Sequence, residues 1–150
     1  MTLIRGRGDL AQEGLQYNCL VLIMRISLLI MIAFVALTAT VSGMLLTAYP
    51  DGSAFGLPLT LLKKTFFTDF LIPGIILTIV GIINLAAIFF IFQKNRNKYN
   101  WSLAAGILIS GWILTEVIMI RGIHWLHFVY FFCGVLIILV SYQLKSKLIV

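Results

Sequence analysis

The sequence predicts an all-α integral membrane protein, folded as a four-helix bundle with both termini on the cytoplasmic side of the membrane. Composition and hydropathy pattern predict this class. Of the 150 residues, 61% are hydrophobic and only 11% are charged, whereas soluble proteins average about 45–50% apolar and about 25% charged residues. The apolar residues are gathered in four long runs separated by short polar segments. A soluble core of this size could not bury so much apolar surface, so a soluble globular domain is excluded.

The four runs predict membrane-spanning helices over residues 20–46, 70–92, 101–120 and 125–142. Each crossing of the hydrocarbon layer needs about 20 apolar residues, so the chain holds these spans and no separate soluble domain. The spans form one transmembrane domain, residues 19–144, between cytoplasmic tails at 1–18 and 145–150. The first tail is polar, contains glycine and is expected to be mobile. The first run is too long for the apolar part of a signal peptide, which favours an uncleaved span.

The basic residues predict how the spans are oriented. With four spans, eight of the eleven Lys and Arg residues lie on the side of the termini and three lie on the other side. The positive-inside rule then places both termini in the cytoplasm. The eight are Arg5, Arg7, Arg25, Lys94, Arg96, Lys98, Lys145 and Lys147, and the three are Lys63, Lys64 and Arg121. This topology explains the net charge of +6 through adjacent anionic lipid, and nucleic-acid binding is not expected.

The first outer loop carries its own signals. Tyr49-Pro50-Asp51-Gly52 is typical of a type I turn, because proline suits the second position and glycine the fourth. Pro58 is expected to open a short amphipathic helix that lies on the membrane surface. Its apolar face consists of Leu59, Leu62 and Phe66. Thr68 or Asp69 can then cap the second span.

Small side chains recur at every fourth residue in the first three spans and predict where the helices touch. In lipid, helices associate through small residues that let their backbones approach closely. These residues are Ala39, Gly43 and Thr47 in the first span, Gly74 and Thr78 in the second, and Ser102, Gly106 and Ser110 in the third. The alternative is that glycine is simply commoner in membrane helices. The short connection between spans three and four predicts antiparallel neighbours, and Asn84 is expected to make an interhelical hydrogen bond.

Glu116 is the residue that is most costly to place in a membrane. It lies about 6 Å inside the outer end of the third span, at 1.5 Å of rise per residue. Such a carboxyl group must find a partner, face a hydrated cavity or stay protonated. We expect a polar and aromatic pocket at the outer face of the membrane. Its residues are Asp69, Trp112, Glu116, Arg121, His124, Trp125 and His127. The alternative is that Glu116 makes one bundle-stabilising contact and that the aromatic residues form the interfacial belt.

The function most consistent with these residues is non-enzymatic binding of a lipid, a small ligand or a partner membrane protein. No catalytic residue or cofactor motif is apparent, and the absence of Cys-x-x-Cys excludes quinone-linked thiol oxidoreductases. One alternative is a small proton-coupled transporter that uses Glu116. A second alternative is a membrane enzyme or metal protein that uses Glu116, His124 and His127, because the two histidines share a helix face. Expected partners are membrane lipids and a second copy or another membrane protein.

Several motifs also support a resemblance. They are Gly56-Leu57-Pro58-Leu59, Phe67-Thr68-Asp69-Phe70-Leu71-Ile72-Pro73-Gly74, Gly111-Trp112-Ile113, Arg121 and Trp125-Leu126. With these motifs the chain, over roughly residues 50–144, resembles a group of small, uncharacterised four-span bacterial membrane proteins. The resemblance implies a bacterial cytoplasmic membrane. It implies no established activity.

Overall fold

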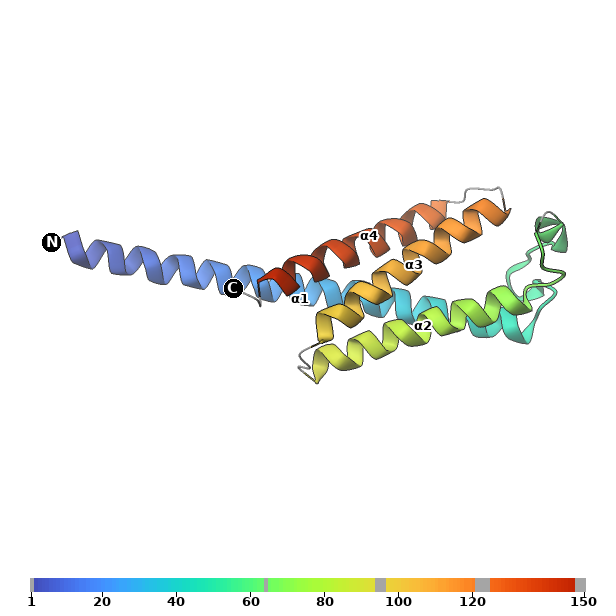
Figure 1. Cartoon of the computed structure of the whole chain (residues 1–150), viewed down its shortest axis with the longest axis horizontal. Helices are drawn as coiled ribbons and strands as arrows, with labels where there is room; N and C mark the ends of the chain where they lie inside the picture. Colours follow the sequence, from blue (N-terminus) through green and yellow to red (C-terminus); the bar gives the residue numbers. More distant parts are fainter. Residues whose placement is uncertain (1, 64, 94–96, 121–124, 148–150) are drawn as a thin grey trace.

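The computed structural model describes residues 2–63, 65–93, 97–120 and 125–147 (Figure 1). This part of the chain is helical and contains no strand. The elements are the α-helices α1 (Thr2–Ala48), α2 (Leu71–Phe92), α3 (Lys98–Ile120) and α4 (Trp125–Ser146), and the 3₁₀ helices η1 (Ser53–Phe55) and η2 (Leu59–Leu62). Each of the four described α-helices contains a stretch long and apolar enough to cross a membrane. The predicted all-α class with four apolar spans is therefore confirmed.

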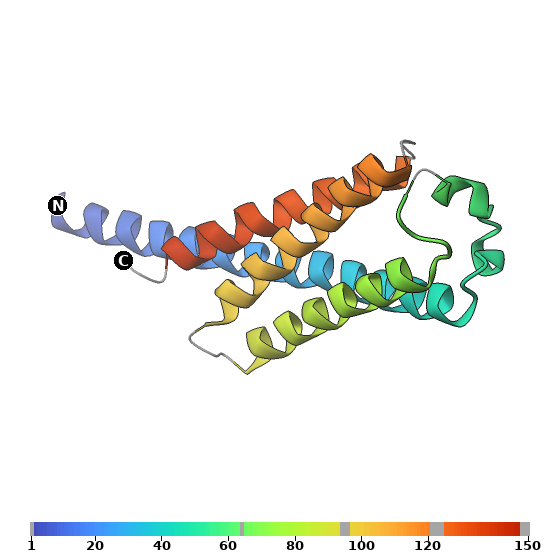
Figure 2. The same ribbon diagram turned by 45° about the vertical axis from the view of Figure 1, so that its right-hand side comes forward.

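The helices form two antiparallel hairpins that pack side by side (Figures 1 and 2). α1 packs mainly against α2 and α3 mainly against α4, while smaller contacts of α2 with α3 and of α1 with α4 close the bundle. The predicted pairing of the third and fourth spans is thus confirmed. Apolar side chains from all four helices meet in the core, including Leu28, Ile32, Val35, Val80, Ala87, Ile109 and Ile137.

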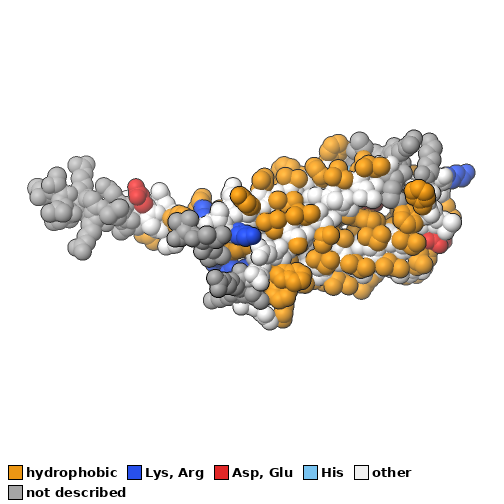
Figure 3. Space-filling model, viewed as in Figure 1, with side chains coloured by type: hydrophobic (Ala, Val, Ile, Leu, Met, Phe, Trp, Pro, Cys, Tyr) orange, Lys and Arg blue, Asp and Glu red, His pale blue; other side chains and the backbone are white. Residues whose placement is uncertain are grey.

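The outside of the bundle is apolar as well. Figure 3 shows hydrophobic side chains along most of the bundle in that view, with charged side chains near its two ends. Ile30, Ile79 and Phe132 are all more than half exposed, at 64%, 51% and 63%. A surface of this kind suits contact with lipid tails rather than water.

α1 is much longer than a membrane span requires. Its 47 residues extend about 70 Å at 1.5 Å per residue, against about 30 Å of hydrocarbon. The N-terminal part of the helix extends beyond the other three helices in Figures 1 and 2. The end of α4 lies beside it, with the Lys147 ammonium 4.9 Å from the centre of the Tyr17 ring. The structure therefore continues the first helix through residues 2–18, which the sequence had led us to expect as a mobile tail.

Backbone contact between α1 and α2 occurs where small residues face each other. A Cβ atom added at Gly43 would lie 2.5 Å from the Thr78 backbone nitrogen, and one at Gly74 would lie 2.8 Å from the Thr47 nitrogen. Gly81 is equally close, since its added Cβ would lie 2.6 Å from the Thr40 nitrogen. The predicted small-residue contacts of the first two spans are confirmed, because only residues without a Cβ permit this approach.

The contact between α3 and α4 also uses small residues but is less close. A Cβ atom added at Gly106 would lie 3.0 Å from the Gly134 carbonyl oxygen, with its other near neighbours being the side chains of Ile137 and Ile138. Gly134 packs against the Ser110 side chain, and Ser102 is completely buried. The stripe predicted on the third span therefore faces α4, whose own contribution, Gly134, was not predicted.

The interhelical hydrogen bond expected for Asn84 is not formed. The side chain is completely buried, but its Nδ2 group donates to the Val80 carbonyl of its own helix at 2.8 Å. Its Oδ1 atom accepts no hydrogen bond in the part of the chain that the structure describes. The expectation was wrong because the carbonyl four residues earlier is always within reach of a helical side chain.

The connection between α1 and α2 begins with the predicted turn, in which the Gly52 amide donates to the Tyr49 carbonyl at 3.0 Å. The predicted amphipathic helix does not follow. η2 is a four-residue 3₁₀ helix, and it ends where the Thr65 amide and hydroxyl both donate to the Leu62 carbonyl, at 2.8 and 2.9 Å. Leu62 is buried, whereas Phe66 is fully exposed. The expected common apolar face of Leu59, Leu62 and Phe66 is therefore absent.

Asp69 marks the beginning of α2. Its carboxylate accepts a hydrogen bond from the Leu71 amide at 3.1 Å, which satisfies one of the free N–H groups of the first turn. Of the two residues that the sequence offers as caps, Asp69 rather than Thr68 makes this contact. Nearby, Phe70 packs with Leu46 and Leu62 in a small apolar cluster, separate from the main core.

A hydrogen-bonded carboxylate in the turn leads to a prediction about pH. The Asp51 carboxylate accepts from the Ser53 hydroxyl at 2.8 Å and from the Ser53 amide at 3.1 Å, and these bonds lower the pKa of Asp51. Because the folded pKa lies below the unfolded one, the resulting stabilisation is present at neutral pH and is lost as the pH falls through the folded pKa. Ser53→Ala is expected to raise the pKa of Asp51 toward its ordinary value, as measured by NMR titration of its carboxyl carbon. Ser146→Ala is the control, and an unchanged pKa in Ser53→Ala would contradict the prediction.

Candidate functional site

Glu116 and His127 meet across the contact between α3 and α4. The Glu116 Oε2 atom lies 3.9 Å from the His127 Nε2 atom. The histidine side chain is 13% exposed and the glutamate side chain is 33% exposed. The Glu116 side chain is therefore the more exposed member of the pair, and the His127 imidazole is mostly buried. The predicted proximity of Glu116 and His127 holds.

Aromatic side chains lie about one helical turn from this pair on both helices. Trp112 precedes Glu116 by four residues and so lies on the same face of α3. Its indole nitrogen is buried and donates no hydrogen bond within the described part of the chain. Tyr130 follows His127 by three residues on α4, and its ring stacks on Phe34 of α1 with 5.8 Å between ring centres. Tyr130 was not predicted as part of the site, although its spacing from His127 was available in the sequence as a signal.

The Tyr130 stack also sets the depth of the site. Phe34 lies near the middle of the predicted first span, and His127 is about one helical turn from Tyr130. Figures 1 and 2 show the C-terminal end of α1 extending beyond the beginning of α4. The Glu116 and His127 pair therefore lies within the length of the bundle rather than at its tip.

Other predicted site residues are not brought to the pair. The Asp69 carboxylate is engaged at the beginning of α2 by the Leu71 amide. Trp125 is two residues from His127, which is about 200° of rotation on an α-helix, and it is 70% exposed. Arg121 and His124 lie outside the described residues. Of the predicted residues, the structure brings Glu116 and His127 together, and Trp112 lies one helical turn before Glu116 on α3.

Comparisons with known proteins give no further guidance. No protein-family model, curated protein or solved structure matches the chain. The site must therefore be interpreted from its own residues. Among the described residues, no three His, Cys, Asp or Glu side chains are grouped as metal ligands would be.

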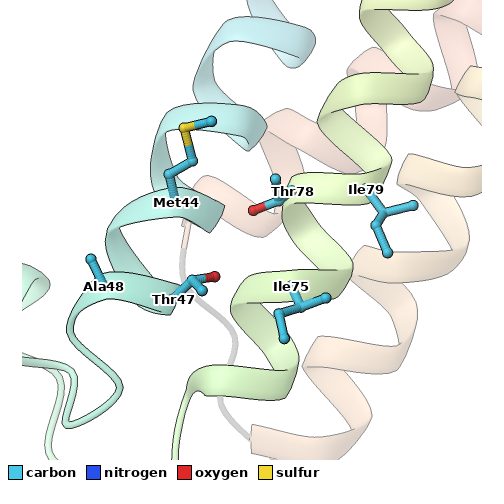
Figure 4. Close-up of a pocket in the computed structure, with 6 residues that line it drawn as sticks. All are labelled: Met44, Thr47, Ala48, Ile75, Thr78 and Ile79. Carbon is cyan, nitrogen blue, oxygen red and sulfur yellow. The ribbon is translucent and has the colours of Figure 1, made fainter.

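A second concave surface lies between α1 and α2, away from the Glu116 pair. This groove has a volume of about 340 Å³ and is lined by Met44, Thr47, Ala48, Ile75, Thr78 and Ile79 (Figure 4). The two threonine hydroxyls donate to the Gly43 and Gly74 carbonyls of their own helices, each at 2.8 Å. The groove thus presents mainly methyl and methylene groups and no ionisable side chain. It offers apolar contact only, whereas the α3 and α4 site contains two ionisable side chains, Glu116 and His127.

Proposed function

We propose that this chain is a non-enzymatic integral membrane protein that binds a lipid, a small ligand or a partner membrane protein at the site between α3 and α4. The observation that carries the proposal is the partly exposed Glu116 side chain, whose carboxyl group lies 3.9 Å from His127. An ionisable residue within a membrane span is expensive unless it has a partner or a function. A purely structural ion pair would be better buried and closer, at about 2.7–2.9 Å.

The surrounding hydroxyl groups favour binding over covalent catalysis. The Ser110 hydroxyl donates to the Gly106 carbonyl at 2.8 Å, and the Thr115 hydroxyl donates to the Gly111 carbonyl at 2.9 Å. Each is thus bonded within its own helix, whereas a nucleophile must be hydrogen-bonded to its base. The Ser110 and Thr115 hydroxyls are therefore both engaged by carbonyl groups of α3.

The proposal includes a location. The eight basic residues on the side of the termini favour a bacterial cytoplasmic membrane with both termini in the cytoplasm. The connection of residues 49–70, together with the 3₁₀ turn η2, then lies at the outer surface. Glu116 and His127 face the outer half of the bilayer in this topology, where a ligand from the outer leaflet can reach them.

Substituting Glu116 tests the proposal directly. Native mass spectrometry of the full chain released from membranes is expected to detect a bound ligand, and Glu116→Gln is expected to reduce its occupancy about tenfold, the effect of losing about 1.4 kcal/mol of binding free energy. Glu13→Gln is the matched control, because Glu13 is the other glutamate of the chain. Equal occupancy in the two variants would refute a role for the site.

A second candidate function is a small proton-coupled transporter, which the pairing of two titratable side chains on different helices favours. In reconstituted vesicles, substrate movement driven by a proton gradient and abolished by Glu116→Gln would support this candidate over simple binding. Gradient-independent binding that still requires Glu116 would support the first proposal.

A further inference from the structure

We propose that the ligand of this site is a membrane-partitioned amphiphile whose polar group is an ammonium, either a protonated amine or a quaternary nitrogen. This inference rests on the proposed function, because it names the chemical class that the Glu116 site takes. It depends on three features of the described residues: the bonding of the carboxyl group, the aromatic surface beside it and the direction of access.

The first feature is that few hydrogen-bond donors of the described residues lie near the Glu116 carboxylate. A carboxylate can accept about four hydrogen bonds. Among the described residues, its only close ionic partner is the His127 Nε2 atom at 3.9 Å, beyond hydrogen-bonding distance. Because the Glu116 side chain is 33% exposed, a donor or cation from a ligand can reach its carboxylate. An ammonium group supplies the positive charge that pairs with a carboxylate. If it is a protonated amine, it also supplies up to three hydrogen-bond donors.

The second feature is an aromatic side chain about one helical turn from each member of the pair. Trp112 lies one turn before Glu116, and Tyr130 lies one turn after His127. The faces of tryptophan and tyrosine rings attract cations, and the attraction grows when the cation is removed from water. Together with the carboxylate they form an environment suited to a positively charged nitrogen, including one that has no N–H group to donate.

The third feature is access from the lipid. The Glu116 side chain is 33% exposed, and Phe131, which follows His127 by four residues and so lies on the same face of α4, is 36% exposed. Val117 is partly buried against the core. The pair thus has an exposed apolar side chain beside it on the outside of the bundle. A ligand reaching it from the membrane has hydrocarbon attached to its charged group, which makes it an amphiphile.

Other polar groups fit less well. A phosphate or sulfate group would be repelled by the carboxylate, and His127, behind Glu116, is the less exposed member of the pair. A neutral alcohol can donate one hydrogen bond but gains nothing from charge or from the aromatic faces. The ammonium is the polar group that uses all three features.

Trp112 provides a fluorescent reporter for the test. The chain has three tryptophans, so a Trp101→Phe, Trp125→Phe variant retains Trp112 alone. The full-length variant is purified in maltoside micelles, which contain no nitrogen, and titrated with dodecylamine. We expect a saturable change in Trp112 emission whose half-saturation concentration rises at least about tenfold in Glu116→Gln, as expected for the loss of one buried charge contact. Glu13→Gln is expected to titrate like the parent.

Probes that share the same hydrocarbon chain but differ in their polar group test whether the site prefers an ammonium. Dodecanol and dodecanoate are expected to produce no saturable change. If dodecanol titrates as well as dodecylamine, or if Glu116→Gln binds dodecylamine with unchanged affinity, the ammonium proposal is wrong. Should Glu116→Gln fail to fold, the comparison of the three probes on the Glu116-containing protein decides the question alone.

Two further comparisons separate the possible outcomes. Competition by phosphatidylethanolamine but not by phosphatidylglycerol identifies the ammonium as that of a lipid headgroup, whereas binding of dodecylamine without such competition identifies a free amphiphilic amine. Both support the ammonium class. A Glu116-dependent native ligand without saturable binding of any amine refutes the ammonium inference and leaves the proposed function standing. If neither a native ligand nor an amine depends on Glu116, both are refuted.

Discussion

Gly81→Ala is expected to destabilise the bundle by about 3 kcal/mol, at the upper end of the cost of overpacking a core. The new methyl group would lie 2.6 Å from the Thr40 backbone nitrogen and 2.9 Å from its Cα atom. These are backbone atoms of α1, which cannot rotate aside as a side chain can. The helices must separate, and the close contact that replaces hydrophobic drive in a membrane is lost. Unfolding in mixed micelles with increasing dodecyl sulfate measures the effect.

Gly111→Ala is the matched control for this prediction. Gly111 is also in an apolar span, but a Cβ atom added there meets nothing within 4 Å. Alanine favours a helix over glycine by up to about 1 kcal/mol, so this variant is expected to be as stable as the parent or slightly more so. Gly106→Ala is expected to fall between the two, because two of its three nearest contacts are isoleucine side chains. Equal stability of Gly81→Ala and Gly111→Ala would mean that α1 and α2 are not in backbone contact.

Phe70→Ala is expected to unfold the connection between α1 and α2 locally, with a loss of about 3–5 kcal/mol, as for other buried phenylalanines. Phe70 is 3% exposed and packs with Leu46 and Leu62, while its amide donates to the Pro50 carbonyl at 2.9 Å. Removing the ring leaves a cavity where the loop is fastened to the helices. Hydrogen exchange of the Leu57 amide, which donates to the Gly52 carbonyl at 3.0 Å, is expected to accelerate about a hundredfold or more.

Phe66→Ala is the same substitution four residues earlier and serves as the control. Phe66 is fully exposed, so its removal is expected to change stability by less than about 0.5 kcal/mol and to leave the exchange of Leu57 unchanged. If Phe66→Ala accelerated exchange as much as Phe70→Ala, the loop would be held by Phe66 and not by the cluster of Leu46, Leu62 and Phe70.

The difference between Phe66 and Phe70 shows that the spacing of apolar residues did not predict which of them is buried in the loop. Leu59, Leu62 and Phe66 have the spacing of an amphipathic helix, but a pattern of this length is also compatible with a turn. The hydrogen bonds of Thr65 to the Leu62 carbonyl end the helix early. The apolar residue that fastens the loop, Phe70, belongs to the edge of the next span, where one apolar residue among many gives no distinguishing signal.

The candidate site was predictable in part for a related reason. Glu116 stands out because a carboxyl group inside an apolar run is costly, and His127 stands out as a titratable residue near the same end. Their contact depends on how far α3 and α4 are rotated about their axes. Trp125 lies only two residues from His127, yet it falls on a different side of α4 and is largely exposed. Their positions in the sequence alone could not show that His127, and not Trp125, lies beside Glu116.

The four apolar helices, their approximate ends and the small residues by which the first three pack could all be predicted from the amino-acid sequence. These follow from composition and spacing, since the bilayer sets the length of an apolar helix and close contact in lipid requires small residues. The assembled bundle was needed to show that α1 pairs with α2 through backbone contact and that Gly134 completes the contact with α3. It was also needed to show that Glu116 lies beside His127, whereas Asp69 caps α2. The physical reason is that helix rotation and register depend on all the packed side chains together. For that reason the four apolar runs predict a bundle, whereas the accessible acid beside an imidazole emerges only when the helices are assembled.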